Sequence, residues 1–392
     1  MKIVSIVGAR PQLIKAAAVS RAIDRYNLQN SNDQINEILI HTGQHYDYNM
    51  SQIFFDQLKI HKPQHHLGVG SGNHGKMTGR MLAKIEEVLL KERPDYVLVY
   101  GDTNSTLAGA LAATKLNIPV VHVEAGLRSF NRRMPEEINR VITDHISSFL
   151  FCPTETAVMN LEAEGIHGEG AINNRLSATS YALPRIVANV GDVMYDAYLH
   201  YKSLASTQSD ILSKHNPVGC EYCLATVHRQ ENTDNPERLS NIFFAFRELA
   251  TREFPIILPL HPRTVKCLKD HNIKLDPDSW VNIIPPVNYI DMIALECSAR
   301  IILTDSGGMQ KEAYFAGVPC ITLRDETEWV ETIEAGANFL AGANKETIHK
   351  VFDLALKTKV KIRAGLYGEG NASQLILRHL TSEYFQNNLK FG

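Results

Sequence analysis

Short apolar runs alternate with longer helical patterns along almost the whole chain of 392 residues. Runs this short and continuously apolar are typical of parallel strands that are covered on both faces. The runs are Ile3–Val7, Glu37–His41, Tyr96–Tyr100, Pro119–Val123, Ser148–Cys152, Ile186–Val190, Cys223–Val227, Pro255–Leu260, Val281–Pro285, Arg300–Thr304 and Val318–Leu323. Helical stretches such as Gln12–Tyr26, Met77–Lys91 and Ser105–Leu116 separate them. This βαβ repetition predicts an α/β protein with doubly wound parallel sheets.

The chain is long enough for two large domains, because a domain averages roughly 150 residues. The polar stretch Ile166–Pro184 has the composition of a surface excursion, and the domain change should follow it near Gly191–Val193. We therefore predict one Rossmann-like domain over residues 1–191 and a second over 192–368. Ligands bind outside the carboxyl ends of strands in such sheets, so two sheets facing each other would enclose a central cleft.

Charge and cysteine usage restrict the partners and the compartment. The formal net charge is −3, which gives no electrostatic footprint for nucleic acid or an acidic membrane. No apolar run approaches the roughly eighteen residues of a membrane span. Six cysteines, mostly in apolar segments, fit a reducing compartment. We therefore expect a cytoplasmic protein. Cys220 and Cys223 have the CxxC spacing of some zinc sites, but we expect them to enter a buried strand rather than bind zinc.

Polar clusters follow nearly every expected strand. They are Gly8–Pro11, His41–His45, Gly101–Asn104, His122–Gly126, His228–Asn232, His261–Arg263, Thr304–Gly308 and Arg324–Asp325. One such cluster would be explained by a cap or a turn. Their repetition at successive strand ends instead favours a ligand site lined by charged groups.

Asp305-Ser306-Gly307-Gly308 is the sharpest of these clusters, because a strand there runs into a glycine pair and then a helix. Backbone N–H groups and the positive end of a helix dipole suit an anion such as phosphate. Glu312, one turn into the helix, has the reach to accept a ribose hydroxyl. The alternative is a plain turn in which Ser306 caps the helix. Arg10 and Lys15 offer cations at the corresponding turn of the first half.

Other motifs do not support a different chemistry. Gly70–Gly75 matches GxGxxG, but the polar segment His61–Leu67 before it does not read as the buried strand that a dinucleotide site needs. GxxxxGK[ST] and HExxH do not occur in the sequence. His41 and His45 are as compatible with a loop as with a metal site, and we assign no metal ligand.

Carboxylates are the second group of candidate site residues in the first half of the sequence. Asp102, Glu124 and the pair Glu136-Glu137 follow neighbouring strands, interleaved with Arg128, Arg132, Arg133 and Arg140. Each acid alone would be explained by a salt bridge. Together they suggest an acid–base constellation whose charge is balanced by guanidinium groups.

These residues resemble the non-hydrolysing UDP-N-acetylglucosamine 2-epimerase family nearly end to end. The motifs that carry the resemblance are Gly8–Pro11, Gly101–Thr103, His122–Arg128, Pro135–Glu137, Val227–Arg229 and Asp305–Gly308. It implies a glycosyltransferase-B-like fold of two facing Rossmann-like domains, usually as a homodimer. It also implies a C-terminal helix, over residues 369–392, that packs back on the first domain.

The resemblance further implies an isomerase of surface polysaccharide biosynthesis that eliminates UDP from a UDP-sugar and adds it back on the other face. Asp102, Glu124, Glu136 and His228 match the family's catalytic residues. Substrate binding would fall to Arg10, Lys15, Arg140, Ser306, Gly307, Gly308, Glu312 and Arg324. Gln44 and His45 resemble a stretch that binds an activating second UDP-sugar, with an ordinary loop as the alternative. No cofactor is implied, because the reaction is redox-neutral.

Some details resemble the branch of this family that acts on UDP-2,3-diacetamido-2,3-dideoxyglucuronate, notably Ala9 and Gln12 in the first turn. The substrate expectation therefore covers both this uronate and UDP-N-acetylglucosamine. Arg132, Arg133 or His74 would meet the extra carboxylate. A hydrolysing epimerase and a glycosyltransferase of the same fold remain alternatives.

Overall fold

The structure is a computed structural model that describes residues 1–43, 60–70, 72–168, 185–215, 219–273 and 279–382. The chain divides into two compact units. Unit 1 comprises Met1–Ala197 and Ala364–Gly392, and unit 2 comprises Tyr198–Arg363. The domain limits at residues 191 and 368 that we drew from the sequence stay predictions, and each unit is described here by itself.

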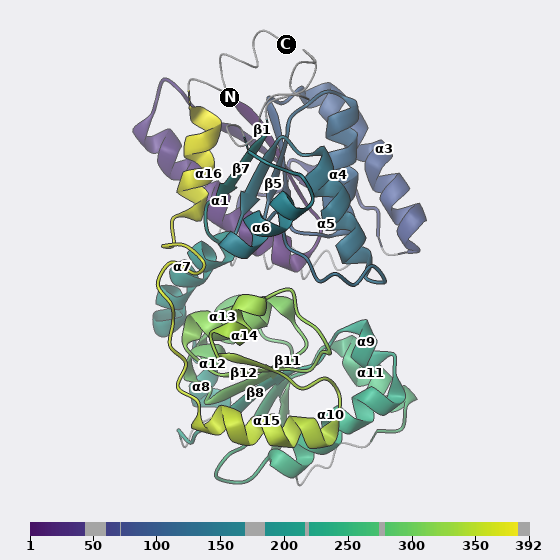
Figure 1. Ribbon diagram of the computed structural model, residues 1–392, viewed down its shortest axis with the longest axis vertical. Coiled ribbons are helices and arrows are strands. Elements are labelled where there is room, and N and C mark those ends of the chain that lie inside the picture. The colour runs from purple at the N-terminus through teal and green to yellow at the C-terminus, as the bar shows by residue number, and fades with distance from the viewer. Residues whose placement is uncertain (44–59, 71, 169–184, 216–218, 274–278, 383–392) are drawn as a thin grey trace. The chain divides into compact units, whose positions relative to one another are not determined.

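Unit 1 is built on one parallel sheet with the order β3-β2-β1-β4-β5-β6-β7 (Figure 1). Its strands are β1 (Lys2–Val7), β2 (Asn36–His41), β3 (His65–His66), β4 (Tyr96–Tyr100), β5 (Val120–Val123), β6 (Phe149–Cys152) and β7 (Ile186–Asn189). The central strands are apolar and buried on both sides, as in other parallel sheets. Backbone pairing is parallel at each contact between neighbouring strands.

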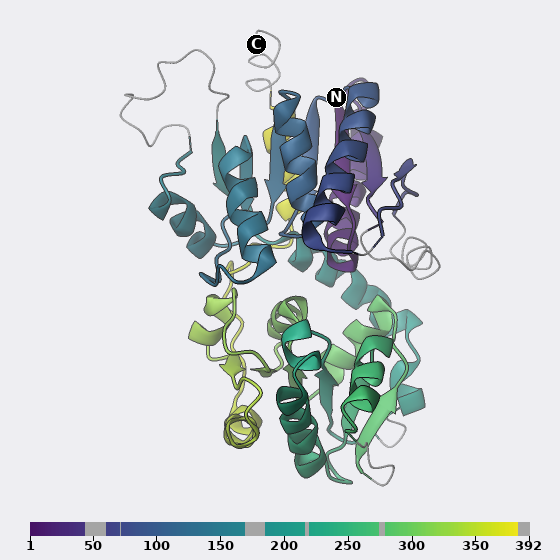
Figure 2. The same ribbon diagram turned by 90° about the vertical axis from the view of Figure 1, so that its right-hand side faces the viewer.

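Helices cover both faces of this sheet (Figures 1 and 2). They are α1 (Arg10–Gln29), α3 (His74–Glu92), α4 (Asn104–Lys115), α5 (Pro135–Ile146), α6 (Glu155–Ala163), α7 (Val193–Gln208) and α16 (Ala372–Thr381). Helices α3, α4 and α5 lie side by side on one face, where Met81, Ile85 and the alanines of α4 pack on Val4, Ile6 and Val99. Helix α16 packs against α1. Helix α7 begins in unit 1 and continues into unit 2.

Unit 2 repeats this plan with the strand order β10-β9-β8-β11-β12-β13. Its strands are β8 (Cys223–Thr226), β9 (Ile256–Pro259), β10 (Val281–Ile284), β11 (Ile301–Thr304), β12 (Cys320–Thr322) and β13 (Asn338–Leu340). Its helices are α8 (Ile211–His215), α9 (Gln230–Thr233), α10 (Pro236–Leu249), α11 (Pro262–Asp270), α12 (Tyr289–Ser298), α13 (Gly307–Ala316), α14 (Val330–Glu334) and α15 (Lys345–Lys357). Phe246 of α10 and Phe352 of α15 belong to the core cluster on one face of the sheet.

The α/β class with doubly wound parallel sheets, predicted from the alternating runs, is confirmed. Strands β3 and β13 were not predicted. Strand β3 consists of two histidines at the edge of the sheet. The segment before Gly70 therefore pairs with the sheet, although it is too polar to be a central strand. Among the described residues, no helix is long and apolar enough to span a membrane.

Candidate functional site

Each sheet has one topological switch point, where the connections that follow two neighbouring strands leave the sheet in opposite directions. In unit 1 it lies between β1 and β4, because β1 continues through α1 to β2 whereas β4 continues through α4 to β5. In unit 2 it lies between β8 and β11 for the same reason. Open α/β sheets bind ligands outside the carboxyl ends of the strands at such points. The clusters Gly8–Pro11, Gly101–Asn104, Val227–Arg229 and Thr304–Gly308 occupy these positions.

Asp102 is held at the end of β4 by Arg140 of α5. The guanidinium donates through Nη2 to Asp102 Oδ2, and through Nη1 to Glu137 Oε2 at 3.1 Å. Arg140 is buried, whereas the Asp102 side chain keeps 30% of its surface exposed. The ion pair therefore orients a carboxylate that solvent, or a ligand, can still reach.

Glu124 follows β5 and forms a buried ion pair with Lys15 of α1. Gly101 passes close to this pair in the left-handed region, with φ of 62°. A Cβ at Gly101 would lie 3.0 Å from Glu124 Oε2 and 3.1 Å from Lys15 Nζ. Glycine is thus needed both for the backbone conformation and for the space beside the charged pair.

The two adjacent acids of α5 have different environments. Glu137 is buried and accepts hydrogen bonds from Ser129 N, Ser129 Oγ and Phe130 N, each at 2.9 Å, so it holds the loop before α5. The Glu136 side chain is half-buried and makes no hydrogen bond or ion pair within the described part of the chain. Of the two, Glu136 is therefore the carboxylate available for proton transfer.

Gln12 links the turn after β1 to the end of β4. Its Oε1 accepts from Gly8 N at 2.9 Å and from Ala9 N at 3.1 Å, while its Nε2 donates to Tyr100 O at 2.8 Å. The side chain is buried. Gln12 thus fixes the end of β1 against the end of β4.

A chain of amides leads from Asp102 to His74 at the start of α3. Asn139 Nδ2 donates to the Asp102 carbonyl at 2.9 Å and to Asn104 Oδ1 at 3.1 Å. Because a carbonyl only accepts, these bonds orient both amides and leave Asn104 Nδ2 to donate to His74 Nδ1 at 3.0 Å. This chain of hydrogen bonds ties the exposed His74 side chain to the backbone of Asp102.

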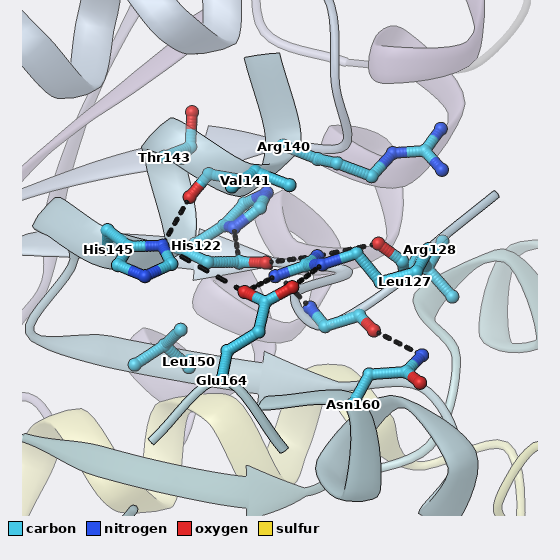
Figure 3. Close-up of polar contacts among 12 residues, drawn as sticks. His122, Leu127, Arg128, Arg140, Val141, Thr143, His145, Leu150, Asn160 and Glu164 are labelled. Atoms are coloured by element: carbon cyan, nitrogen blue, oxygen red, sulfur yellow. Dashed lines mark hydrogen bonds and ion pairs between the residues drawn. The ribbon is translucent and has the colours of Figure 1, made fainter. Parts of the chain in front are cut away.

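A buried network joins Asp144 of α5 to His122 and Arg128, and Figure 3 shows the last two residues with Glu164 and His145. His122 Nδ1 lies 2.7 Å from Asp144 Oδ1, and Arg128 Nη1 donates to Asp144 Oδ2 at 2.7 Å. Gly126 N donates to the same Oδ2 at 3.2 Å. Burial acts to raise the pKa of Asp144, but His122 and Arg128 outweigh it and hold that pKa below its ordinary value of 3.8.

Asp144→Asn should lower the free energy of unfolding by about 3–5 kcal/mol at neutral pH, because the change removes a fully buried carboxylate and leaves Arg128 with only the partly exposed Glu164 as an ion-pair partner among the described residues. A lowered folded-state pKa stabilises the fold above the unfolded value of 3.8, and this contribution is lost as pH falls through the folded pKa. The stability difference between wild type and variant should therefore shrink below about pH 4. Urea unfolding of both proteins across this range measures it, and a pH-independent difference would contradict the assignment.

In unit 2, Asp305 organises the turn after β8. It is fully buried and accepts from His228 N at 3.1 Å, from Arg229 N at 3.0 Å and from Asn232 Nδ2 at 3.1 Å. His228 Nδ1 lies 3.7 Å from Asp305 Oδ1, and 45% of the His228 side chain is exposed. His228 is thus presented on a turn that a buried carboxylate fixes.

Helix α13 begins at Gly307, and Ser306 caps it by accepting from Met309 N at 3.4 Å. A Cβ at Gly307 would lie 2.4 Å from Glu328 Oε1. Arg324 Nη1 donates to Glu328 Oε2 at 2.9 Å. A carboxylate and its arginine therefore lie at the amino end of α13, where a helix favours negative charge. Ser306 acts as a cap, and phosphate binding by Ser306, Gly307 and Gly308 stays a prediction.

Glu312 lies on the same helix and is nearly buried. The Tyr289 hydroxyl donates to Glu312 Oε1 at 2.7 Å. Burial, and then the Glu312 charge, raise the pKa of Tyr289 well above its ordinary value, so the phenol stays a donor. The bond orients the carboxylate that the sequence assigned to a ribose.

The structure thus brings Asp102 together with Arg140, and Lys15 together with Glu124. Arg10 begins α1 and is exposed. Gln44 and His45 lie outside the described residues. Cys223 is buried in β8 and Cys220 lies just before it. The sequence analysis did not assign Asp144, Glu328 or Tyr289, which lie on helices or in a loop rather than at strand ends.

Comparison with known proteins gives matches over nearly the whole chain. The family model described as UDP-N-acetylglucosamine 2-epimerase matches residues 27–381. A Pseudomonas aeruginosa protein named UDP-2,3-diacetamido-2,3-dideoxy-D-glucuronate 2-epimerase is 48% identical over 380 residues, which cover 97% of this chain and 99% of that protein. The UDP-N-acetylglucosamine 2-epimerase of Methanocaldococcus jannaschii is 46% identical over 386 residues, with the same coverage.

Solved structures agree with these sequence matches. The crystal structure of the Methanocaldococcus jannaschii enzyme in complex with UDP-GlcNAc and UDP has a TM-score of 0.86, at 46% identity over 97% of this chain and 99% of that chain. The Neisseria meningitidis enzyme bound to UDP-GlcNAc has a TM-score of 0.83, at 30% identity and the same coverage.

Proposed function

The chain belongs to the UDP-N-acetylglucosamine 2-epimerase family, and on that premise we propose that it inverts C2 of a UDP-linked 2-acetamido sugar without hydrolysing it. The observation that carries the proposal is the pair of accessible carboxylates in unit 1. Asp102 is oriented by Arg140 and remains exposed, while Glu136 is half-buried and unpaired within the described residues. Two such groups are what proton removal and proton return at one carbon require.

The reaction must pass through an elimination, because the C2 hydrogen of the sugar is not next to a carbonyl and is not acidic. The C2–H electrons form the C1–C2 double bond as the C1–O bond breaks, and the proton goes to a carboxylate. UDP then leaves C1 with the bonding pair. In the return step a UDP oxygen adds to C1, and C2 takes a proton on its other face. No electrons are gained or lost overall.

Asp102 and Glu136 are assigned to the two proton transfers, and Glu124 to the positive charge that develops at C1 as UDP departs. The ion pair with Lys15 keeps Glu124 fixed, so its carboxylate needs no reorganisation during the reaction. Arg140 balances the charge of Asp102 and Glu137. The buried cations of unit 1 thus allow several carboxylates to stay close together.

The nucleotide is assigned to unit 2. There, the point between β8 and β11 at which the connections leave in opposite directions is next to the start of α13, which favours an anion. Ser306, Gly307 and Gly308 would meet the phosphates, together with Arg324, and Glu312 the ribose. His228 would serve the departing diphosphate from the turn that Asp305 fixes. UDP has to stay bound while it is detached, since its loss would turn the epimerase into a hydrolase.

Glu312→Gln should weaken UDP binding about fivefold to tenfold, since a charge-assisted hydrogen bond to the ribose, worth about 1.5 to 3 kcal/mol, becomes a neutral one worth about 0.5 to 1.5 kcal/mol. Tyr289 can still donate to the amide oxygen, so the helix should keep its shape. Titration calorimetry with UDP gives the affinity. Glu346→Gln, an exposed acid of α15, is the matched control and should leave the affinity unchanged. Equal affinities for all three proteins would contradict the role of Glu312.

Two sugars fit the proposal, UDP-N-acetylglucosamine and the diacetamido uronate that the Pseudomonas aeruginosa relative is named for. The uronate needs a further cation for its C6 carboxylate. Arg132 and Arg133 are both exposed on the loop before α5, whereas His74 Nδ1 is already in a hydrogen bond with Asn104, so we assign that charge to one of the two arginines. The homodimer, the cytoplasmic location and the role in polysaccharide synthesis stay predictions.

Product analysis tests the function directly. Purified protein is incubated with each UDP-sugar, and the products are separated by anion-exchange chromatography. We expect a UDP-linked manno isomer at equilibrium with the starting sugar, and the substrate with the larger kcat/KM identifies the branch. Free N-acetylmannosamine with UDP would show a hydrolysing epimerase, and transfer of the sugar to an acceptor would show a glycosyltransferase.

A further inference from the structure

His122 has an environment that defines its protonation. It lies in β5, is fully buried, and its ring nitrogens lie 2.7 Å from Asp144 Oδ1 and 2.7 Å from the Gly101 carbonyl oxygen. Ionised carboxylate and carbonyl oxygens only accept hydrogen bonds. Both ring nitrogens must therefore carry a hydrogen if both bonds are made, which is the imidazolium form.

The charges around the ring support the same form. Arg128 pairs with Asp144 and also donates through Nε and Nη2 to Glu164 at 2.7 Å each (Figure 3). Asp144 and Glu164 carry two negative charges, and Arg128 supplies one positive charge. Glu164 keeps 28% of its side chain exposed and shares Arg128, whereas Asp144 is fully buried. An imidazolium at His122 adds a second positive charge beside this buried carboxylate, which favours its ionised form.

The remaining titratable neighbours do not supply the missing charge. His145 is half-exposed, donates to Val141 O at 2.8 Å and lies 4.0 Å from Glu164 Oε2, at the outer end of the network. Burial raises the pKa of Cys152 in the adjacent strand β6 well above its ordinary value, so this thiol stays neutral. Arg185 donates to the His145 carbonyl at 2.8 Å and interacts electrostatically with Asp144, but within the described residues no ion pair joins the two.

The network fixes both turns that carry the proposed catalytic acids. His122 binds the carbonyl of Gly101, which directly precedes Asp102 and has a left-handed φ of 62°. Asp144 accepts from Gly126 N, two residues after Glu124. One charged pair thus determines where the peptide before Asp102 and the turn after Glu124 lie.

We propose that His122 is a buried imidazolium, held by Asp144, which positions Asp102 and Glu124 for the proton transfer and charge stabilisation of the reaction. Its kinetic consequence rests on the proposed function, but its protonation state does not. The ring needs both hydrogens to make its two hydrogen bonds. Asp102 then stays in place without a contact between His122 and the substrate.

The protonation state is measured on the wild-type enzyme by ¹⁵N NMR with histidine-selective labelling, and His122→Gln assigns the signal. We expect both ring nitrogens of His122 to show the shifts of protonated nitrogen under the conditions of the activity assay. A ring with one unprotonated nitrogen under these conditions would overturn the inference. This readout needs no activity, so it is independent of the proposed function.

The positioning role is measured by kinetics. His122→Gln should lower kcat about 100-fold, the order of loss expected from a displacement of about 1 Å at the reacting groups, with little change in KM. The thermal unfolding curve followed by circular dichroism checks that unit 1, which carries the substitution, is folded. His145→Gln is the matched control at the outer end of the network and should keep its kcat. A loss confined to KM, or an equal loss in His145→Gln, would contradict the role.

A double variant separates positioning by charge from simple loss of packing. His122→Gln combined with Asp144→Asn removes one charge of each sign, so the Arg128–Glu164 pair remains balanced. We expect the loss of kcat in the double variant to be smaller than the product of the two single losses. Losses that multiply would show independent structural effects and would overturn the proposal.

Discussion

Asp102→Asn is expected to lower kcat about 100- to 10,000-fold, the usual contribution of a general acid or base. The amide keeps the shape of the side chain, and its oxygen can still accept from Arg140, so the change removes proton transfer and leaves the turn in place. Steady-state rates with the preferred UDP-sugar measure the effect. KM and UDP affinity should change little, because the residue is not assigned to binding the nucleotide.

The control for this variant is Asp353→Asn, which changes an exposed acid of α15 in unit 2. It should turn over at the wild-type rate. An Asp102→Asn enzyme with unchanged kcat would show that Asp102 does not transfer a proton, and the remaining assignment of the carboxylates would have to be rebuilt around Glu124 and Glu136.

Glu136→Gln should abolish epimerisation to a similar extent, again about 100- to 10,000-fold, but with a different isotope pattern. Each acid is assigned to one face of C2, so a variant that lacks one acid can still remove and return the proton on the other face. In D₂O each single variant should therefore exchange the C2 hydrogen of one isomer without converting it. The isomer that each variant exchanges then identifies the face on which the remaining acid works.

NMR of both UDP-sugar isomers with both variants measures this pattern. We expect Asp102→Asn and Glu136→Gln to be complementary, one exchanging the gluco isomer and the other the manno isomer. Glu87→Gln, an exposed acid of α3 in the same unit, is the matched control and should epimerise normally. Exchange of the same isomer by both variants would refute the assignment of one acid to each face.

The positions of the site residues could be predicted from the sequence because parallel strands end at one edge of a sheet. This rule placed Asp102 and Glu124 after β4 and β5, and Asp305 after β11. It could not choose between Glu136 and Glu137, since both lie in the first turn of α5. Their difference arises from the loop at Ser129 and Phe130, whose amides bind only Glu137.

Features that depend on contacts distant in sequence could not be predicted. The hydrogen bond that holds His74 comes from a chain of amides contributed by α4 and α5, which no spacing in the sequence reveals. The charge of His122 likewise depends on Asp144 and on the carbonyl of Gly101. Strand β3 escaped prediction because two histidines at a sheet edge carry no apolar pattern.

Proton NMR in D₂O of the purified protein with UDP-N-acetylglucosamine, and then with the diacetamido uronate, tests the central claim most directly. Elimination and re-addition predict conversion to the manno isomer with solvent deuterium at C2 and with the sugar still linked to UDP. Conversion without deuterium at C2 would contradict proton removal by a carboxylate that exchanges with solvent. Unchanged, deuterium-free sugar in both incubations would contradict the proposed epimerase activity itself.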